Sequence, residues 1–260
     1  MPDQPRILVS NDDGYRSEGL ATLVAVLEDL AEIWVVAPES ERSATSHAIT
    51  IHRPLRLKEV EGKPRWYAVD GTPTDCAWLG INHVLRDRRP QLLVSGINHG
   101  PNLADDVFYS GTVAAAREAA IIGVPSVAVS LAARRAFEFG PAARFARALV
   151  ERALAEPLPP NMHLNVNVPP GIVPEEWIAS RQGKHSYGAD VVEKTDPRGR
   201  KYYWIGGNEY QHEDIPGSDC NAVLREGRVA VTALTLDSTD YPQRKQLGEW
   251  NLKGFRRHDP

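Results

Sequence analysis

The sequence of 260 residues is long enough for one large α/β domain, or for one domain with an appendage. Hydrophobic residues make up 42% and charged residues 25%, a balance typical of a globular protein with a substantial core. The net charge of −4 and the lack of a long Lys/Arg run argue against nucleic acid as a partner. Cys76 and Cys220 form no disulfide framework and no zinc-binding spacing, and no stretch resembles a signal or membrane segment. A cytoplasmic protein without a membrane partner is therefore expected.

Strand and helix patterns alternate through the first two thirds of the sequence and predict an α/β fold with a parallel sheet. We expect buried strands over residues 7–10, 32–37, 91–95, 124–130 and 162–168. We expect helices over residues 19–30, 73–85, 113–122 and 137–154. The alternating stretches 48–60 and 66–69 are expected to be strands of an antiparallel excursion.

The character of the sequence changes after Pro169. Strand-like pieces at residues 177–181, 201–205 and 228–234 are separated by polar loops, and residues 246–255 suit a terminal helix or an arm. We therefore divide the chain into a catalytic core over 1–168 and an extension over 169–260. This β-rich extension is expected to complete the domain, or to pair with another subunit as an arm.

The first predicted strand ends in the polar turn Asn11-Asp12-Asp13-Gly14. Two adjacent carboxylates at the end of a buried strand repel each other, and a bound cation would neutralise them. Gly14 permits a tight turn, and Ser17 can cap the helix that follows. This pattern suggests a divalent-metal site, although an acidic surface loop that caps a helix would have the same sequence.

Two later strand ends carry further oxygen donors. Ser43 lies in the hydroxyl-rich loop after the second strand, and Asn98 lies in the glycine- and amide-rich loop after residues 91–95. Ligands collect at the carboxyl ends of strands in parallel α/β sheets, and such oxygen donors suit Mg²⁺ or Mn²⁺. The alternatives are a simple loop serine and an asparagine that stabilises a turn. His99 suits an acid or base role and a surface position equally well.

The sequence Ser110-Gly111-Thr112 precedes an alanine-rich helix. Free backbone N–H groups at a helix N-terminus, together with two hydroxyls, form a ready anion site. A metal site and an anion site that face one crevice suggest a phosphate ester as the substrate. Ser110 could also serve as a helix cap and nothing more.

Taken together, these stretches resemble the SurE family of metal-dependent 5'-nucleotidases. The matching segments appear in the family's order, from about residue 6 to residue 236: ILVSNDDG, VVAPESERSATS, GTPTDCAWLG, VSGINHGPNLADDVFYSGTVAAAREA and DPRGRKYYWIGG. The resemblance implies a Rossmann-like three-layer core with a mostly parallel sheet. It also implies hydrolysis of nucleoside 5'-monophosphates, with 3'-monophosphates and short polyphosphate as further substrates.

By motif position, the resemblance assigns site residues as follows. One divalent cation, Mg²⁺ or Mn²⁺, would be held by Asp12, Asp13, Ser43 and Asn98, with the two aspartates as the catalytic pair. The phosphate would face Asn11, Ser110, Gly111 and Thr112. The family also forms homodimers that exchange C-terminal segments, and some members form tetramers, which suits the region after Pro169.

Two positions depart from the family pattern. Ala233 replaces a proline, and His99 occupies a variable position, which weakens its claim to be an obligatory acid. We expect a cation-bound water to attack the phosphoryl group. An aspartyl-phosphate on Asp12 is less favoured, because the D-x-D-x-T pattern is absent. The rival interpretations are a nucleotide-binding protein without catalysis, since a fold does not dictate function, and a purely structural oligomerisation module.

Overall fold

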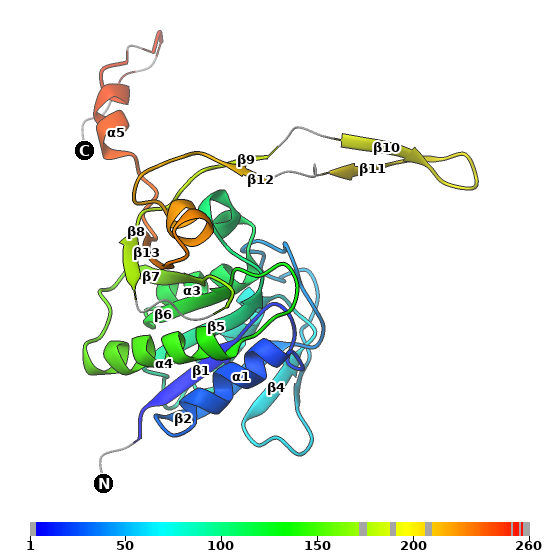
Figure 1. Cartoon of the computed structure of the whole chain (residues 1–260), viewed down its shortest axis with the longest axis vertical. Helices are drawn as coiled ribbons and strands as arrows, with labels where there is room; N and C mark the ends of the chain where they lie inside the picture. Colours follow the sequence, from blue (N-terminus) through cyan, green and yellow to red (C-terminus); the bar gives the residue numbers. More distant parts are fainter. Residues whose placement is uncertain are drawn as a thin grey trace.

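The computed structural model describes residues 4–171, 176–187, 191–205, 210–250, 252–254 and 256. In this part of the chain, nine strands form one sheet in the order β3-β4-β2-β1-β5-β6-β7-β13-β8 (Figure 1). The strands are β1 (Arg6–Ser10), β2 (Glu32–Pro38), β3 (Leu57–Glu59), β4 (Trp66–Val69), β5 (Leu92–His99), β6 (Ser126–Leu131), β7 (Met162–Val168), β8 (Trp177–Ser180) and β13 (Val229–Thr235). The run from β4 to β7 is parallel throughout, which confirms the predicted α/β fold.

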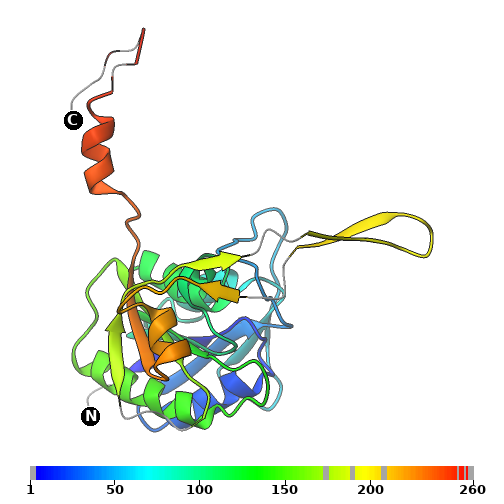
Figure 2. The same ribbon diagram turned by 45° about the horizontal axis from the view of Figure 1, so that its top comes forward.

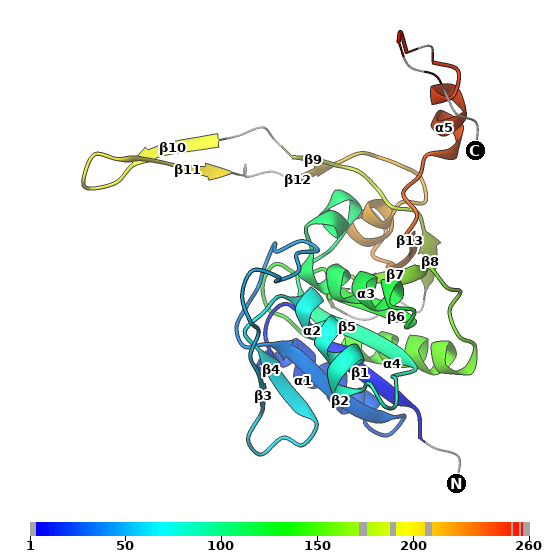
Figure 3. The same ribbon diagram turned by 180° about the vertical axis from the view of Figure 1, so that it is seen from behind.

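Helices cover both faces of this sheet and give the molecule three layers (Figure 3). One face carries α1 (Glu18–Leu27) and α4 (Gly140–Ala155). The other carries α2 (Pro73–Leu79), which η1 (Gly80–Val84) continues, and α3 (Gly111–Ile121). No described helix is long and apolar enough to cross a membrane.

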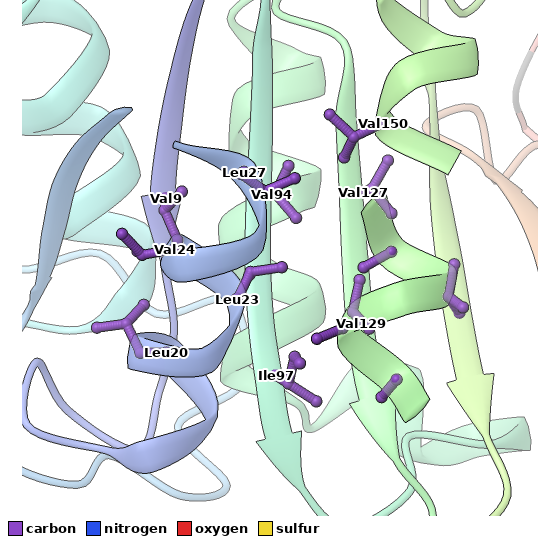
Figure 4. Packing of buried hydrophobic residues seen from close by; sticks show 14 of the residues in the cluster. Val9, Leu20, Leu23, Val24, Leu27, Val94, Ile97, Val127, Val129 and Val150 are labelled. Carbon is purple, nitrogen blue, oxygen red and sulfur yellow. The ribbon is translucent and has the colours of Figure 1, made fainter. Parts of the chain in front are cut away.

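The core between α1 and the sheet follows from the helical spacing of apolar residues. Leu20, Leu23 and Leu27 recur at intervals of three and four, so they share one face of α1 and are fully buried. Figure 4 shows this face against Val9 and Val94 of the central strands. Burial of such side chains contributes about 1.5–3 kcal/mol each, which anchors α1 and β1 beside the turn that joins them.

Several predicted boundaries differ from the structure. The prediction of strand over residues 48–60 is wrong for most of its length, since only β3 forms. Side chains bind the backbone of this segment instead: the N–H of Thr50 donates to Asp75 and that of Arg56 to Asp70, both at 2.8 Å. These contacts leave the segment as a loop against α2. The helix predicted over 137–154 begins only at Gly140, and the strand predicted over 91–95 continues to His99.

The segment after residue 168 contributes to the main sheet and also projects from it. β13 pairs antiparallel with β7, and β8 pairs parallel with β13. A small sheet joins β9 (His185–Tyr187) to β12 (Tyr210–His212). The hairpin of β10 (Val191–Thr195) and β11 (Lys201–Ile205) extends far from the body, and so does α5 (Tyr241–Leu247) (Figures 1 and 2).

The predictions for this segment were partly right. Strands were expected over 177–181, 201–205 and 228–234, and β8, β11 and β13 confirm them. The strand β10 was not predicted. The terminal helix lies earlier than residues 246–255, because Asp240 caps it and Pro242 occupies its first turn; residues 251, 255 and 257–260 lie outside the described part.

Candidate active site at the carboxyl ends of the strands

Asp12 and Asp13 lie in the turn that directly follows β1. Gly14 adopts φ +95°, a conformation that favours glycine, and its carbonyl accepts a hydrogen bond from Asn11 Nδ2 at 3.0 Å. The same amide donates to Ser17 Oγ at 2.8 Å, and Ser17 caps α1. Asn11 thus holds the turn together from a buried position and does not line the pocket, although the family resemblance placed it beside the phosphate.

Burial is the main influence on the pKa values of the two carboxylates. Asp12 is only 6% exposed, and this burial raises its pKa from 3.8 to about 6. The hydrogen bond from Thr112 lowers the pKa of Asp12, and the neighbouring Asp13 raises it. Burial also raises the pKa of Asp13, against the opposing effect of His99. Two acids held in this way favour a cation beside them.

The loop after β2 brings Ser43 to the pocket. The N–H of Arg42 donates to the carbonyl of Asp12 at 2.7 Å, so the loop is fixed to the end of β1. Ser43 Oγ donates to Glu41 Oε1 at 2.5 Å. Glu41 and Asp106 therefore add two further carboxylates to the pocket wall, and sequence reasoning placed neither of them in the site. The available signal for Glu41 was its place in the same polar loop as Ser43, and for Asp106 its place in the acidic pair Asp105-Asp106 before Ser110.

The loop after β5 supplies Asn98 and His99. Asn98 Nδ2 donates to the carbonyl of Gly100 at 2.9 Å, and its Oδ1 lies 3.4 Å from Thr112 Oγ1. The turn-stabilising role and the presentation of an oxygen donor are therefore compatible. His99 Nδ1 lies 2.9 Å from Asp13 Oδ2, so the histidine contacts the acid pair and is not a free surface residue.

The N-terminus of α3 closes the site from the other side. Ser110 Oγ accepts from the N–H of Val113 at 3.0 Å, which makes it the helix cap, and Ser110 also lines the pocket. Thr112 is fully buried and its hydroxyl donates to Asp12 Oδ1. Gly111 allows this approach, because a Cβ there would lie 2.8 Å from the Cβ of Asp12. Thr112 thus positions Asp12, while the backbone N–H groups of the first turn and the positive end of the helix dipole favour an anion.

These elements enclose a pocket of about 680 Å³. The predicted metal ligands all line it: Asp12, Asp13, Ser43 and Asn98. Within the described residues, no group of three or more His, Cys, Asp or Glu side chains is placed to hold a metal. The donor set here is instead two carboxylates, an amide oxygen and a hydroxyl, which fits a hard cation such as Mg²⁺ or Mn²⁺. The raised pKa of Asp12 supports that fit, since a cation would relieve the buried negative charge.

Comparison with known proteins finds relatives that are similar over nearly the whole chain. The sequence pattern of the family described as Survival protein SurE matches residues 7–189. A protein of Myxococcus xanthus named 5'-nucleotidase SurE is 64% identical, over 100% of this chain and 99% of its own. A protein of the same name from Anaeromyxobacter dehalogenans is 58% identical over 97% and 98%. The crystal structure of the SurE protein from Aquifex aeolicus aligns with a TM-score of 0.84 and 39% identity, over 94% of this chain and 98% of that one.

Proposed function

Because the chain belongs to the SurE family, we propose that it hydrolyses nucleoside 5'-monophosphates to nucleoside and phosphate, with the help of a divalent cation. The names of the relatives support its assignment as a 5'-nucleotidase, a phosphoric monoester hydrolase. The observation that carries the proposal is the pocket in which Asp12 and Asp13 face Asn98, Ser43 and the start of α3. A binding protein that holds nucleotide through the same cation would share these acids, so phosphate release is what separates the two functions.

The cation is proposed to bind Asp12, Asp13, Ser43 and Asn98. When bound, it would polarise a phosphoryl oxygen and lower the pKa of a water molecule. Thr112 fixes the orientation of Asp12 through its hydrogen bond. Gly100 fixes Asn98 through its carbonyl, which directs the amide oxygen of Asn98 toward the site.

The protein supplies the remaining groups of the reaction. Asp13 is less buried than Asp12 and contacts His99, so it is the better placed of the two to orient the attacking water. The N–H groups at the start of α3 and the hydroxyl of Ser110 would stabilise negative charge on the transferring phosphoryl group. In this assignment, Asn11 and Thr112 act by holding the catalytic turn and Asp12, not by touching phosphate.

The substrate range is proposed to include 3'-monophosphates and short polyphosphate. Both present a terminal phosphoryl group that could lie in the same pocket of about 680 Å³. Phosphate release should be measured from a panel of 5'- and 3'-monophosphates and from tripolyphosphate, with Mg²⁺ or Mn²⁺. Release from the 5'-monophosphates supports the function, and none from any substrate by folded protein would refute it.

Self-association is proposed to use the segments that project from the body. The β10–β11 hairpin exposes Tyr203, Trp204 and Ile205, the last to 92%. The helix α5 exposes Tyr241 and Leu247. Apolar side chains on isolated elements are typical of surfaces that a second copy covers, so a homodimer or tetramer is expected.

We place the protein in the cytoplasm, which suits its free, buried cysteines Cys76 and Cys220.

A further inference from the structure

We infer that a second pocket beside the catalytic one binds the nucleoside half of the substrate, with the base against Phe137 and Leu224. This inference rests on the proposed function, because it assigns the leaving group of the same reaction. The second pocket has a volume of about 430 Å³, within the range of small-molecule sites. It is therefore large enough to accept a group of nucleoside size.

The two pockets meet at a shared wall. Asn98, His99, Pro101 and Asp106 line both of them. If the phosphate of a substrate lies at the start of α3, its leaving group would therefore extend past these shared residues into the second pocket. The sugar would lie at the junction, where the carboxylate of Asp106 can accept a hydrogen bond from a hydroxyl.

The far part of the second pocket is apolar. Leu103 and Ala133 contribute buried walls, Phe137 a partly buried ring, and Leu224 a side chain that is 48% exposed. Planar aromatic bases bind well against such walls, because their apolar ring surface is removed from water and stacks on an aromatic side chain. Neither a bare phosphate nor polyphosphate would gain from these contacts, so this surface suits a nucleoside.

Phe137 is held in place by other aromatic side chains. Its ring stacks on Phe139 at 5.9 Å, with an interplanar angle of 8°. The ring of His99 meets both phenyl rings edge-on, at 4.9 Å from Phe137 and 4.8 Å from Phe139. The same histidine contacts Asp13 of the acid pair. His99 thus contacts both the aromatic side chains proposed to hold the base and the turn that carries Asp13.

Polar groups at the edge of this pocket would select the orientation of the base. His185 lies with Nδ1 3.3 Å from Asp106 Oδ2, which fixes the carboxylate at the junction. Arg134 also lines the pocket and brings a positive charge to its edge. A base would therefore meet apolar faces above its plane and polar groups at its edge.

The test separates nucleoside binding from phosphate binding. Dissociation constants of adenosine alone and of inorganic phosphate alone should be measured by equilibrium dialysis with Mn²⁺ present, using the full chain. We expect Phe137→Ala and Leu224→Ala each to weaken adenosine binding by about 3- to 10-fold and to leave phosphate binding unchanged. Phe108→Ala is the matched control, because Phe108 is an exposed phenylalanine that lines neither pocket.

Leu224 keeps the test independent of His99, because it comes from η3 (Asn221–Arg225) and not from the aromatic group. If both variants bind adenosine as the wild type does, or if adenosine binding is lost only in Tyr109→Ala, the subsite assignment is overturned. Tyr109 is the exposed aromatic residue of the catalytic pocket and marks the competing location.

Phosphate release from adenosine 5'-monophosphate should be followed in parallel. Release by the wild type together with unchanged adenosine binding in both variants would overturn the subsite and leave the hydrolase proposal intact. Adenosine binding that depends on Phe137 and Leu224, without any phosphate release, would support the subsite and refute the hydrolase. Failure of the wild type to bind adenosine would overturn the subsite whatever the activity.

Discussion

The hydroxyl of Thr112 donates a hydrogen bond to Asp12 Oδ1 and so joins the start of α3 to the end of β1 across 100 positions of sequence. This contact fixes one of the two buried acids beside a helix N-terminus. The negative charge of Asp12 and the positive end of α3 thus face the same small volume. A phosphate ester and a cation would both be stabilised there.

Replacement of Asp12 by asparagine tests the role of this acid. Asp12→Asn should lower cation-dependent phosphate release by more than about 100-fold, because a proposed ligand and its charge are removed. The cation-free variant should unfold at a temperature no lower than that of the wild type, since burial of the ionised acid is unfavourable. Asp29→Asn, in an exposed ion pair with Arg147, is the control and should keep full activity. Wild-type turnover in Asp12→Asn would contradict the ligand assignment.

Close packing at Gly111 gives a second prediction. An added Cβ would lie 2.8 Å from the Cβ of Asp12 and 2.9 Å from Pro73 Cγ, so Gly111→Ala must push α3 away from β1. We expect a loss of about 1–3 kcal/mol in the free energy of unfolding and a large loss of activity. Gly140→Ala is the matched control at the start of α4, where the nearest atom is the end of the Arg144 side chain at 3.8 Å. Urea unfolding of both variants checks this, and equal stability would argue against the packing.

The sequence predicted well which strand ends line the pocket, because their signal is local. A buried strand followed by Asp12 and Asp13 predicts an acidic turn at the carboxyl end of that strand, independently of the rest of the sequence. By contrast, the contribution of Glu41 depends on how one loop folds over another. The roles of Asn11 and Thr112 depend on which way a single side chain turns, which no spacing encodes.

In other segments, tertiary contacts produced a structure that differs from the one the local hydrophobic pattern predicts. The alternating residues 48–56 did not become a strand, because Asp70 and Asp75 bind the backbone N–H groups that a neighbouring strand would need. The β10–β11 hairpin was only half predicted, since Val191–Thr195 carries few apolar residues and packs on no core. Its partner Lys201–Ile205 was predicted as a strand and carries three aromatic residues, a composition typical of strands.

A buried histidine predicts how stability depends on pH. His163 of β7 is fully buried, and burial lowers its pKa from 6.5 to about 4. Between these values the unfolded chain binds a proton that the folded chain does not, so stability should fall as pH decreases from about 6.5 to 4. The expected loss is on the order of 2–3 kcal/mol. Urea unfolding at pH 7 and pH 5 should show a smaller difference in His163→Leu than in the wild type. An identical difference would exclude His163 as the source.

The projecting hairpin predicts how the chain associates. Substitution of both Trp204 and Ile205 by serine should shift the protein toward smaller species, because these side chains are 63% and 92% exposed and would be covered by another subunit. Light scattering after size-exclusion chromatography gives the masses. Ile51→Ser is the control, since Ile51 is 85% exposed on the body. A wild-type monomer, or no change in the double variant, would contradict an interface at the hairpin.

A cation held at the Asp12–Asp13 pocket is proposed to enable phosphate release, and chelation followed by restoring the cation tests this most directly. Phosphate release from a nucleoside 5'-monophosphate should be recorded before EDTA treatment, after it, and after Mg²⁺ or Mn²⁺ is restored, for the wild type and Asp12→Asn side by side. We predict that release by the wild type disappears with EDTA and returns with the cation, while Asp12→Asn stays inactive throughout. Full release by the wild type in EDTA, or recovery of Asp12→Asn with added cation, would contradict a role for this cation in phosphate release.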